Sequence, residues 1–305
     1  MPSACKTLVA LVACCCAALW TGAAGALVDD ARAVGIQGQA AALSARYVAL
    51  KGEFADNPFR RPIHLLSTEG RDNVTGEIFA VLNSSFATTS SVLEKPGYWC
   101  DILILHLNNK YCRPSTTAGG TMLNVSVGRK SDQALADAYR VNFAFRIAAK
   151  SADYLQVDLA AKDGPLSTHD YKVVLEATPA DDGQTFIRLS YGYSFGMLGQ
   201  LAMRTYLNTI ARDKVGFSVT RDAGKAPQPV GGMRGAVERN TMRYYLAIEA
   251  FLGALSAPPA TRLEKSARDW FAATEAYPRQ LHEIDQSEYL AMKRKEYARQ
   301  QIEMN

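Results

Sequence analysis

The sequence predicts an α+β protein in which an antiparallel β-meander is combined with long helices. Apolar and polar residues alternate with a period of two in five segments between residues 123 and 193, which is the pattern of half-buried strands. Short turns rich in Asp, Gly and Pro separate most of these segments, so neighbouring strands are expected to run antiparallel. Beyond the last strand, apolar residues recur at helical spacing instead.

The strands are placed by this alternation. One strand is expected early, at Val74–Val81, and the other five form the meander, at 123–127, 141–147, 155–159, 173–177 and 187–193. Turns at 150–153, 163–165 and 181–183 connect the last four of them. The alternation also predicts that one face of the sheet is covered.

Helices are expected at both ends of the chain and between the first two strands. Ser84 or Ser85 can cap a short helix that runs towards Glu94, with Pro96-Gly97 as its end. The longer helical segments are Gln37–Phe54, Phe195–Arg212, Ala236–Leu255, Leu263–Tyr277 and a last one that begins near Asp285.

The first residues have the pattern of a secretory signal. Lys6 precedes an apolar stretch at residues 8–20, and Ala24-Gly25-Ala26 forms an A-x-A cleavage site. We therefore expect cleavage after Ala26 and a periplasmic or secreted protein, with no transmembrane segment in the mature chain. A lipoprotein signal acylated at Cys14 is the alternative.

Removing this signal leaves Cys100 and Cys112 as the cysteines of the mature chain. An even count in an exported protein favours one disulfide over a metal site or a catalytic thiol. A fully extended segment would hold the two residues roughly 40 Å apart, whereas bonded cysteines need α-carbons within about 7 Å. The chain must therefore reverse, either through a short helix over Trp99–Leu107 and a returning strand or through a hairpin at 108–110.

Charge and motifs exclude several functions. Losing Lys6 with the signal reduces the 34 Lys and Arg residues to 33, against 30 Asp and Glu, so no basic field indicates nucleic acid as a partner. The four histidines lack metal-ligand spacing, and the chain has no GxSxG or P-loop motif. We expect no metal, no cofactor and no identifiable catalytic residue, and nothing in the sequence indicates a protein partner.

The segment VTGEIFAVLNSSFATTSSVLEKPGYWCDIL combines an opening strand, a helix pair and a tryptophan near the second helix. Followed by antiparallel strands and a long helix, it resembles the START-like helix-grip superfamily of polyketide cyclases and lipid-transfer domains, over roughly residues 74–212. The resemblance implies a β-meander curved around a long helix, either Phe195–Arg212 or Ala236–Leu255, with an apolar cavity between them. It implies lipids, sterols or aromatic polyketides as ligands, and it does not indicate any catalysed reaction.

The N-terminal signal and this resemblance together divide the chain into four parts. They are a signal peptide at 1–26, an N-terminal helical segment at 27–73, a helix-grip-like domain at 74–256 and a C-terminal helical extension at 257–305. Aromatic residues with polar tips and arginines that could anchor a carboxylate are the candidates for ligand contact, with core packing and ion pairs as the competing interpretations. These candidates are Tyr191, Tyr193, Arg239, Arg243 and Tyr245.

One further anion site is conceivable where Gly231, Gly232 and Gly235 accompany Arg234 at a helix start, although simple turn chemistry is favoured there. The leading function is an exported protein that binds a hydrophobic small molecule or lipid without catalysis. The alternatives are a cyclase- or hydrolase-like enzyme that uses Glu176 or Tyr193, and an envelope structural or interaction protein with a filled core.

Overall fold

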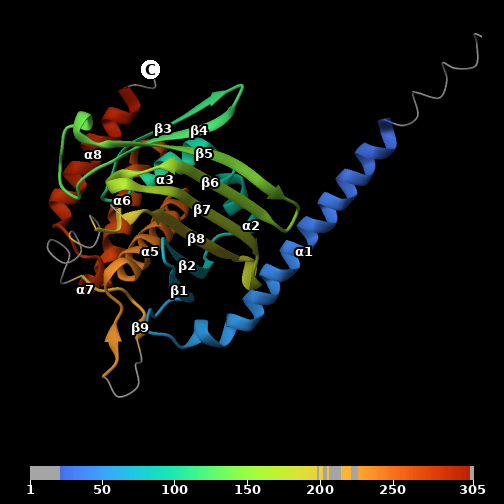
Figure 1. The fold of residues 1–305 in the computed structure, drawn as a ribbon, viewed down its shortest axis with the longest axis horizontal. Helices are drawn as coiled ribbons and strands as arrows, with labels where there is room; N and C mark the ends of the chain where they lie inside the picture. Colours follow the sequence, from blue (N-terminus) through green and yellow to red (C-terminus); the bar gives the residue numbers. More distant parts are fainter. Residues whose placement is uncertain (1–20, 198, 202–204, 206–213, 221–225, 303–305) are drawn as a thin grey trace, which may run out of the picture.

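Eight strands form one antiparallel sheet in the order β1-β2-β8-β7-β6-β5-β4-β3 (Figure 1). The computed structural model describes residues 21–197, 199–201, 205, 214–220 and 226–302, with side chains from residue 33 onward. The strands are β1 Ile63–Glu69, β2 Asn73–Leu82, β3 Asn109–Thr117, β4 Gly120–Val127, β5 Tyr139–Lys150, β6 Leu155–Asp163, β7 Thr168–Pro179 and β8 Thr185–Phe195. A separate two-stranded ribbon pairs β9 Val219–Thr220 with β10 Gln228–Pro229.

The helices lie on both faces of this sheet (Figure 1). They are α1 Thr21–Ala55, α2 Phe86–Leu93, α3 Pro96–Leu103, α5 Gly232–Gly253, α6 Pro259–Glu275, α7 Pro278–Leu281 and α8 Gln286–Ile302. No helix within the described part of the chain is long and apolar enough to cross a membrane.

The element order confirms the α+β helix-grip prediction. Strand β2 is followed by α2 and α3, then by the meander β3 to β8, whose last strand returns to pair with β2. All six strands expected from alternation are present as β2 and β4 to β8. Bulges between Ile147 and Ala149 and between His169 and Lys172 interrupt the register, and such bulges bend strands.

Helix α5 lies across the sheet, where it packs against β1, β2, β8 and α3. Of the two candidates, the segment Ala236–Leu255 is therefore the one that covers this face. Gly76 on β2 permits the close approach, because a Cβ there would collide with Oγ1 of Thr241 on α5. The other candidate, Phe195–Arg212, starts inside β8 at Phe195 and falls mostly outside the described residues.

Helix α1 covers the opposite face of the sheet, against β1, β7 and β8. A separate apolar cluster fills this contact and includes Leu43, Leu50, Phe79, Tyr154 and Phe186. Ile63–Glu69 lies in the segment 27–73, beyond the expected helix Gln37–Phe54, and it forms β1 on the edge of the sheet, a strand that the sequence did not predict. Pairing with β2 buries Ile63 and Leu65, and this long-range contact decides the local structure.

The disulfide Cys100–Cys112 is present, with α-carbons 5.1 Å apart. Cys100 lies on α3 and Cys112 on β3, so the helix with a returning strand is confirmed and the 108–110 hairpin is wrong. Ser85 caps α2 by accepting the N–H of Thr88 (3.2 Å). Pro96 begins α3 instead of only ending α2, since proline suits the first turn of a helix.

The C-terminal helices α6, α7 and α8 pack around α5 and the β3 edge of the sheet. Trp270 on α6 is buried and donates its indole N–H to the carbonyl of Arg243 (3.0 Å). Tyr289 on α8 stacks on Trp270, with ring centroids 5.0 Å apart, and donates its hydroxyl to the carbonyl of Leu105 (2.9 Å). The described part of the C-terminal extension, residues 257–302, is therefore packed into the core of the main domain.

Candidate ligand-binding cavity

A cavity of about 910 Å³ lies between α5 and the sheet. It is lined by α3, α5 and strands β4 to β8, together with the loops at 128–133 and 165–168 and residues 283–284. This volume lies within the range of about 300–1,000 Å³ typical of small-molecule sites. The helix-grip arrangement therefore leaves space between its two layers.

Much of the lining is apolar. The strands contribute alternate residues because side chains on a strand point to opposite faces, and α3 contributes residues three and four positions apart. The apolar lining includes Trp99, Ile102, Leu103, Val125, Val127, Val141, Phe143, Leu159, Val173, Leu189 and Ile248.

Tyrosines from three elements form an aromatic part of the wall. Tyr171 stacks on Tyr193 with centroids 5.2 Å apart, and Tyr191 meets Tyr244 of α5 at 5.3 Å. Burial raises the pKa of Tyr171 to about 12, and it raises the pKa of Tyr191, Tyr193 and Tyr244 further. These phenols are therefore neutral at physiological pH, with polar groups that suit hydrogen bonding more than proton abstraction.

The polar part of the lining is rich in cations. The name cavity cluster is used below for His106, Lys130, Lys214, Arg239, Arg243 and Glu283, all of which line the cavity.

Glu283 is the hub of the cavity cluster. Its carboxylate contacts Lys130 at 2.6 Å, Arg243 at 2.7 Å and Lys214 at 3.9 Å. Burial alone would raise its pKa, but Arg243 and Lys130 hold the pKa of Glu283 below its usual value. Conversely, burial and the nearby Arg243 lower the pKa of Lys130 to about 8, against the opposing attraction of Glu283. One carboxylate thus faces three cations.

His106 continues the cavity face of α3 beyond the end of that helix and is only 2% exposed. Its ring stacks on Tyr244, with centroids 4.8 Å apart, and Nδ1 accepts the backbone N–H of Asn108 (3.1 Å). Burial, reinforced by Arg243, Lys293 and Lys130, lowers the pKa of His106 well below its usual value, so the ring is neutral at pH 7. Because Nδ1 accepts a hydrogen bond, the proton of the neutral ring lies on Nε2.

The Nε2 atom of His106 is buried, and no described residue gives it a hydrogen bond of normal geometry. The side chain of Asn240, which also lines the cavity, lies close enough to raise the pKa of the ring slightly. His106 is thus a lining residue whose Nε2 atom is buried within the cavity wall.

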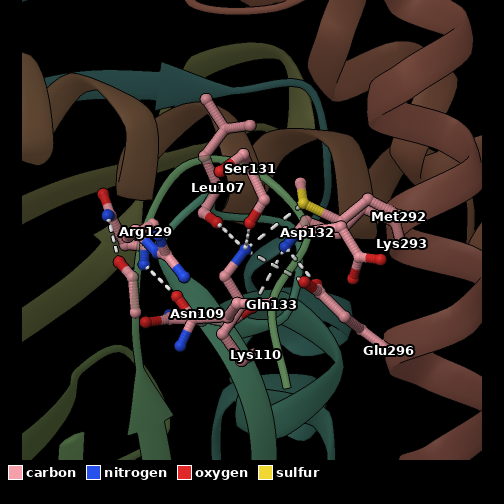
Figure 2. A network of polar contacts seen from close by, with 12 residues as sticks. Leu107, Asn109, Lys110, Arg129, Ser131, Asp132, Gln133, Met292, Lys293 and Glu296 are labelled. Atoms are coloured by element: carbon pink, nitrogen blue, oxygen red, sulfur yellow. Dashed lines mark hydrogen bonds and ion pairs between the residues drawn. The ribbon is translucent and has the colours of Figure 1, made fainter. Parts of the chain in front are cut away.

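A second buried ionic group joins Lys110 of β3 to Lys293 and Glu296 of α8 (Figure 2). The name α8 cluster is used below for Lys110, Lys293 and Glu296, whose side chains are at most 1% exposed. Lys110 Nζ donates to the carbonyls of Leu107 (2.9 Å) and Ser131 (3.1 Å) and to Glu296 (3.0 Å).

Lys293 Nζ donates to the carbonyls of His106 (2.8 Å) and Asn109 (3.0 Å) and to Glu296 (2.7 Å). The loop at 128–133 is fixed from the other side, since Asn108 Nδ2 donates to the carbonyl of Gly128 (2.6 Å). Helix α8 thus holds in place both the His106 segment and the loop that carries Lys130.

Four of the five expected ligand-contact residues line the cavity, namely Tyr191, Tyr193, Arg239 and Arg243. Tyr245 does not line it, and its hydroxyl donates to Glu249 instead (3.1 Å). The reason is the helical rotation of about 100° per residue, which places its neighbour Tyr244 on the cavity side. Sequence reasoning missed His106, Lys130 and Glu283 as lining residues.

Glu238 and Arg239 of α5 contact segments outside their own helix. Glu238 accepts hydrogen bonds from Ser67 Oγ (2.5 Å) and from the backbone N–H groups of Phe217 (2.6 Å) and Ser218 (2.9 Å). Arg239 Nη1 donates to the carbonyl of Val215 (3.2 Å).

The glycine-containing helix start is not part of the cavity. Arg234 donates to Ser67 Oγ (3.1 Å), and none of Gly231, Gly232 and Gly235 is among the lining residues. The histidines outside the cavity lie far apart and contact single carboxylates, His64 with Glu53, His169 with Asp170 and His282 with Glu275. No group of three potential metal ligands occurs within the described ranges.

No protein-family model matches the chain, and no curated protein matches it. Solved structures show a distant likeness. A conserved protein from Geobacillus kaustophilus is 12% identical, with a TM-score of 0.34 over 59% of this chain and 95% of that one. Truncated norcoclaurine synthase from Thalictrum flavum is 13% identical, with a TM-score of 0.31 over 49% and 86% of the two chains.

A further similar structure, Ara h 8.0201, is 13% identical, with a TM-score of 0.33 over 63% of this chain and 99% of that one. Likeness at this level carries no inference about activity. The helix-grip assignment of this chain rests on its own strand order and on the helix α5 that crosses its sheet.

Proposed function

We propose that this chain is an exported protein that binds a hydrophobic small molecule or lipid in the cavity, without catalysis. The observation that carries the proposal is the cavity of about 910 Å³ between the sheet and α5, much of whose wall is aliphatic or aromatic. The residues around a void of this size lack the van der Waals contacts that a filled core would provide. A bound apolar molecule would supply those contacts. A purely structural role does not account for such a space.

Export is supported by two features of the chain. The sequence before Asp29 has the order of a secretory signal with cleavage after Ala26, a prediction that mostly falls on residues outside the described ranges. The Cys100–Cys112 disulfide is the kind of bond that persists in oxidising compartments. A protein purified from the envelope or medium of its host should therefore begin at Leu27 and carry no alkylatable cysteine before reduction.

An enzyme on the same scaffold is the second candidate, and His106 is the observation that favours it. Histidine is the commonest general acid or base in enzymes, and this one lines the cavity, although its low pKa makes it a weak base. The residues considered from the sequence fit less well. Glu176 accepts hydrogen bonds from Tyr154 and Arg188 outside the cavity, and burial keeps Tyr193 protonated.

Ligand binding is tested by native mass spectrometry of the purified protein and by titration with the neutral apolar fluorophore N-phenyl-1-naphthylamine. Two variants of adjacent residues on β7 provide a matched pair. Val173→Trp places a large side chain in the cavity, whereas Val174→Trp places the same side chain on the opposite face. We expect probe binding to weaken by about tenfold or more in the first variant, through lost space and contacts, and to be retained in the second.

The proposal is overturned if the wild-type protein shows only its bare mass and does not bind the probe. It is also overturned if both tryptophan variants bind the probe equally well, because the probe would then occupy some other surface. Turnover of an ester or aldehyde substrate that is lost on changing His106→Phe would establish the enzyme instead.

A further inference from the structure

The tyrosines of the aromatic wall differ in what their hydroxyl groups contact. The Tyr171 hydroxyl forms a hydrogen bond with Oγ1 of Thr168 at 2.7 Å. By contrast, no described residue forms a hydrogen bond with the hydroxyl of Tyr191 or of Tyr193. Neither of these two oxygens is among the buried side-chain atoms of the described chain that lack a partner, so both oxygens keep accessible surface.

This accessible surface belongs to the cavity. Tyr191 and Tyr193 both line it, and they are otherwise buried, with only 6% and 5% of their surface exposed. Buried tyrosine hydroxyls usually have a hydrogen-bond partner, because leaving one unpaired in apolar surroundings costs free energy. The two hydroxyls are therefore available to a molecule that occupies the cavity.

The rings of Tyr191 and Tyr193 are held in place by their neighbours. They are alternate residues on β8, so both side chains point to the same face of the sheet, and their ring centroids lie 6.0 Å apart. Tyr244 of α5 packs against the ring of Tyr191, and Tyr171 of β7 stacks on the ring of Tyr193. Side chains whose rotamers are fixed by packing in this way can hold polar groups in a defined position for a ligand.

The chemistry of these hydroxyls indicates what they would bind. Burial raises the pKa of both phenols, so each is a neutral O–H donor at physiological pH. A hydrocarbon ligand would exclude water from the two hydroxyls and give them no partner, which costs free energy. A carbonyl or hydroxyl oxygen accepts their hydrogen bonds and does not bring a charge that the surrounding apolar wall would have to desolvate.

We propose that Tyr191 and Tyr193 bind an uncharged oxygen of the ligand, a carbonyl or a hydroxyl, while the aliphatic and aromatic wall contacts its hydrocarbon body. This inference rests on the proposed function and deepens it, since it names the ligand class as an apolar molecule with an uncharged oxygen group. The two phenols donate their O–H groups to this oxygen, and recognition requires no charge on the ligand.

The test is competition against bound N-phenyl-1-naphthylamine at pH 7 with two compounds of nearly the same shape. The ketone 2-acetylnaphthalene has a carbonyl oxygen where the hydrocarbon 2-ethylnaphthalene has only hydrogen atoms. The readout is the ratio of the two affinities, ketone over hydrocarbon, compared between protein variants. Because the same two compounds are used throughout, their different solubilities in water cancel in this comparison.

The double variant Tyr191→Phe with Tyr193→Phe removes both hydroxyls and keeps both rings. Tyr245→Phe is the control, because it removes a hydroxyl from a residue of α5 that does not line the cavity. We expect the ketone-to-hydrocarbon ratio to fall about five- to tenfold in the double variant and to change by less than about twofold in the control. Each single variant, Tyr191→Phe or Tyr193→Phe, should lower the ratio by about twofold or more, which keeps the test decisive if the double variant does not fold.

The outcomes distinguish this inference from the proposal beneath it. A ratio that stays unchanged when the hydroxyls of Tyr191 and Tyr193 are removed overturns the assignment of the ligand oxygen, while probe binding leaves the cavity function standing. An equal fall in the Tyr245→Phe control also overturns the assignment, because the effect would not be local to the cavity. Absence of probe binding in the wild-type protein overturns both.

Discussion

The cavity cluster and the α8 cluster are built from the same kinds of side chain but differ in what satisfies them. Each has one carboxylate shared by more than one cation. In the α8 cluster, both ammonium groups donate to backbone carbonyls as well as to Glu296 (Figure 2). The cavity cluster lines an internal space instead.

This difference teaches how to distinguish a structural ionic group from a receptive one. Buried charge by itself indicates neither, because both clusters are buried. A lysine that donates hydrogen bonds to carbonyls and a carboxylate stabilises the fold, whereas a donor that points into a cavity can bind a ligand. His106 connects the two groups, since its carbonyl accepts from Lys293 while its ring faces the cavity.

The largest effect is expected for Glu296→Gln in the α8 cluster. Two buried lysines would lose their shared counter-charge, which should reduce the free energy of unfolding by about 3–5 kcal/mol in urea denaturation. Glu288→Gln on the exposed side of the same helix is the control and should change stability by less than about 0.5 kcal/mol. Equal small losses in both variants would show that the α8 cluster is not a structural ionic group.

The disulfide comes next, because the residues between its cysteines include both His106 and Lys110. Changing Cys100→Ala and Cys112→Ala together should cost about 3 kcal/mol, since the bond closes a short loop in the unfolded chain. Hydrogen exchange should accelerate at residues 105–110 in particular. Unchanged exchange there would mean that α8 alone holds this segment, independently of the Cys100–Cys112 bond.

The substitution Glu283→Gln tests how much the shared carboxylate of the cavity cluster contributes to stability. Lys130, Lys214 and Arg243 would lose a partner, but water entering the cavity could solvate them, so we expect a loss of only about 1–2 kcal/mol. A stability loss as large as that of Glu296→Gln would remove the distinction between the two clusters.

The smallest effect concerns the pH dependence of stability. Burial lowers the pKa of His106 in the folded state, so below about pH 6.5 the unfolded state takes up a proton that the folded state does not. Stability should therefore fall as the pH decreases, by about 1 kcal/mol between pH 7.5 and pH 5.5 from this residue. The His106→Phe variant should lose this component, whereas replacing the exposed His282 with Gln should leave it intact.

The fold was predictable from the sequence where a simple period governs a segment. Strands such as Leu155–Asp163 alternate cleanly because one face packs on the core and the other does not. Strand β1 escaped prediction because only Ile63 and Leu65 mark its buried face, and its pairing partner decides its structure. The choice of α5 as the crossing helix likewise depends on packing that no local pattern encodes.

The candidate site was predictable only on its regular elements. Alternation on β8 identified Tyr191 and Tyr193, and helical spacing on α5 identified Arg239 and Arg243, all of which line the cavity. Lys130 and Glu283 lie in irregular segments that are far apart in sequence, so no period relates them to the sheet. Their ion pair, 2.6 Å long, is a product of the topology alone.

Helix α8 also covers the edge of the sheet that is formed by β3. Strand β3 is an outermost strand, and its Cys112 N–H donates to Gln300 Oε1 of α8 (3.1 Å). Exposed backbone donors on such a margin recruit strands from other molecules, which leads to swapped dimers and fibrils. Because α8 occupies this donor and packs along β3, it protects the edge of the sheet from self-association. A variant truncated just before Gln286, at the start of α8, should therefore polymerise.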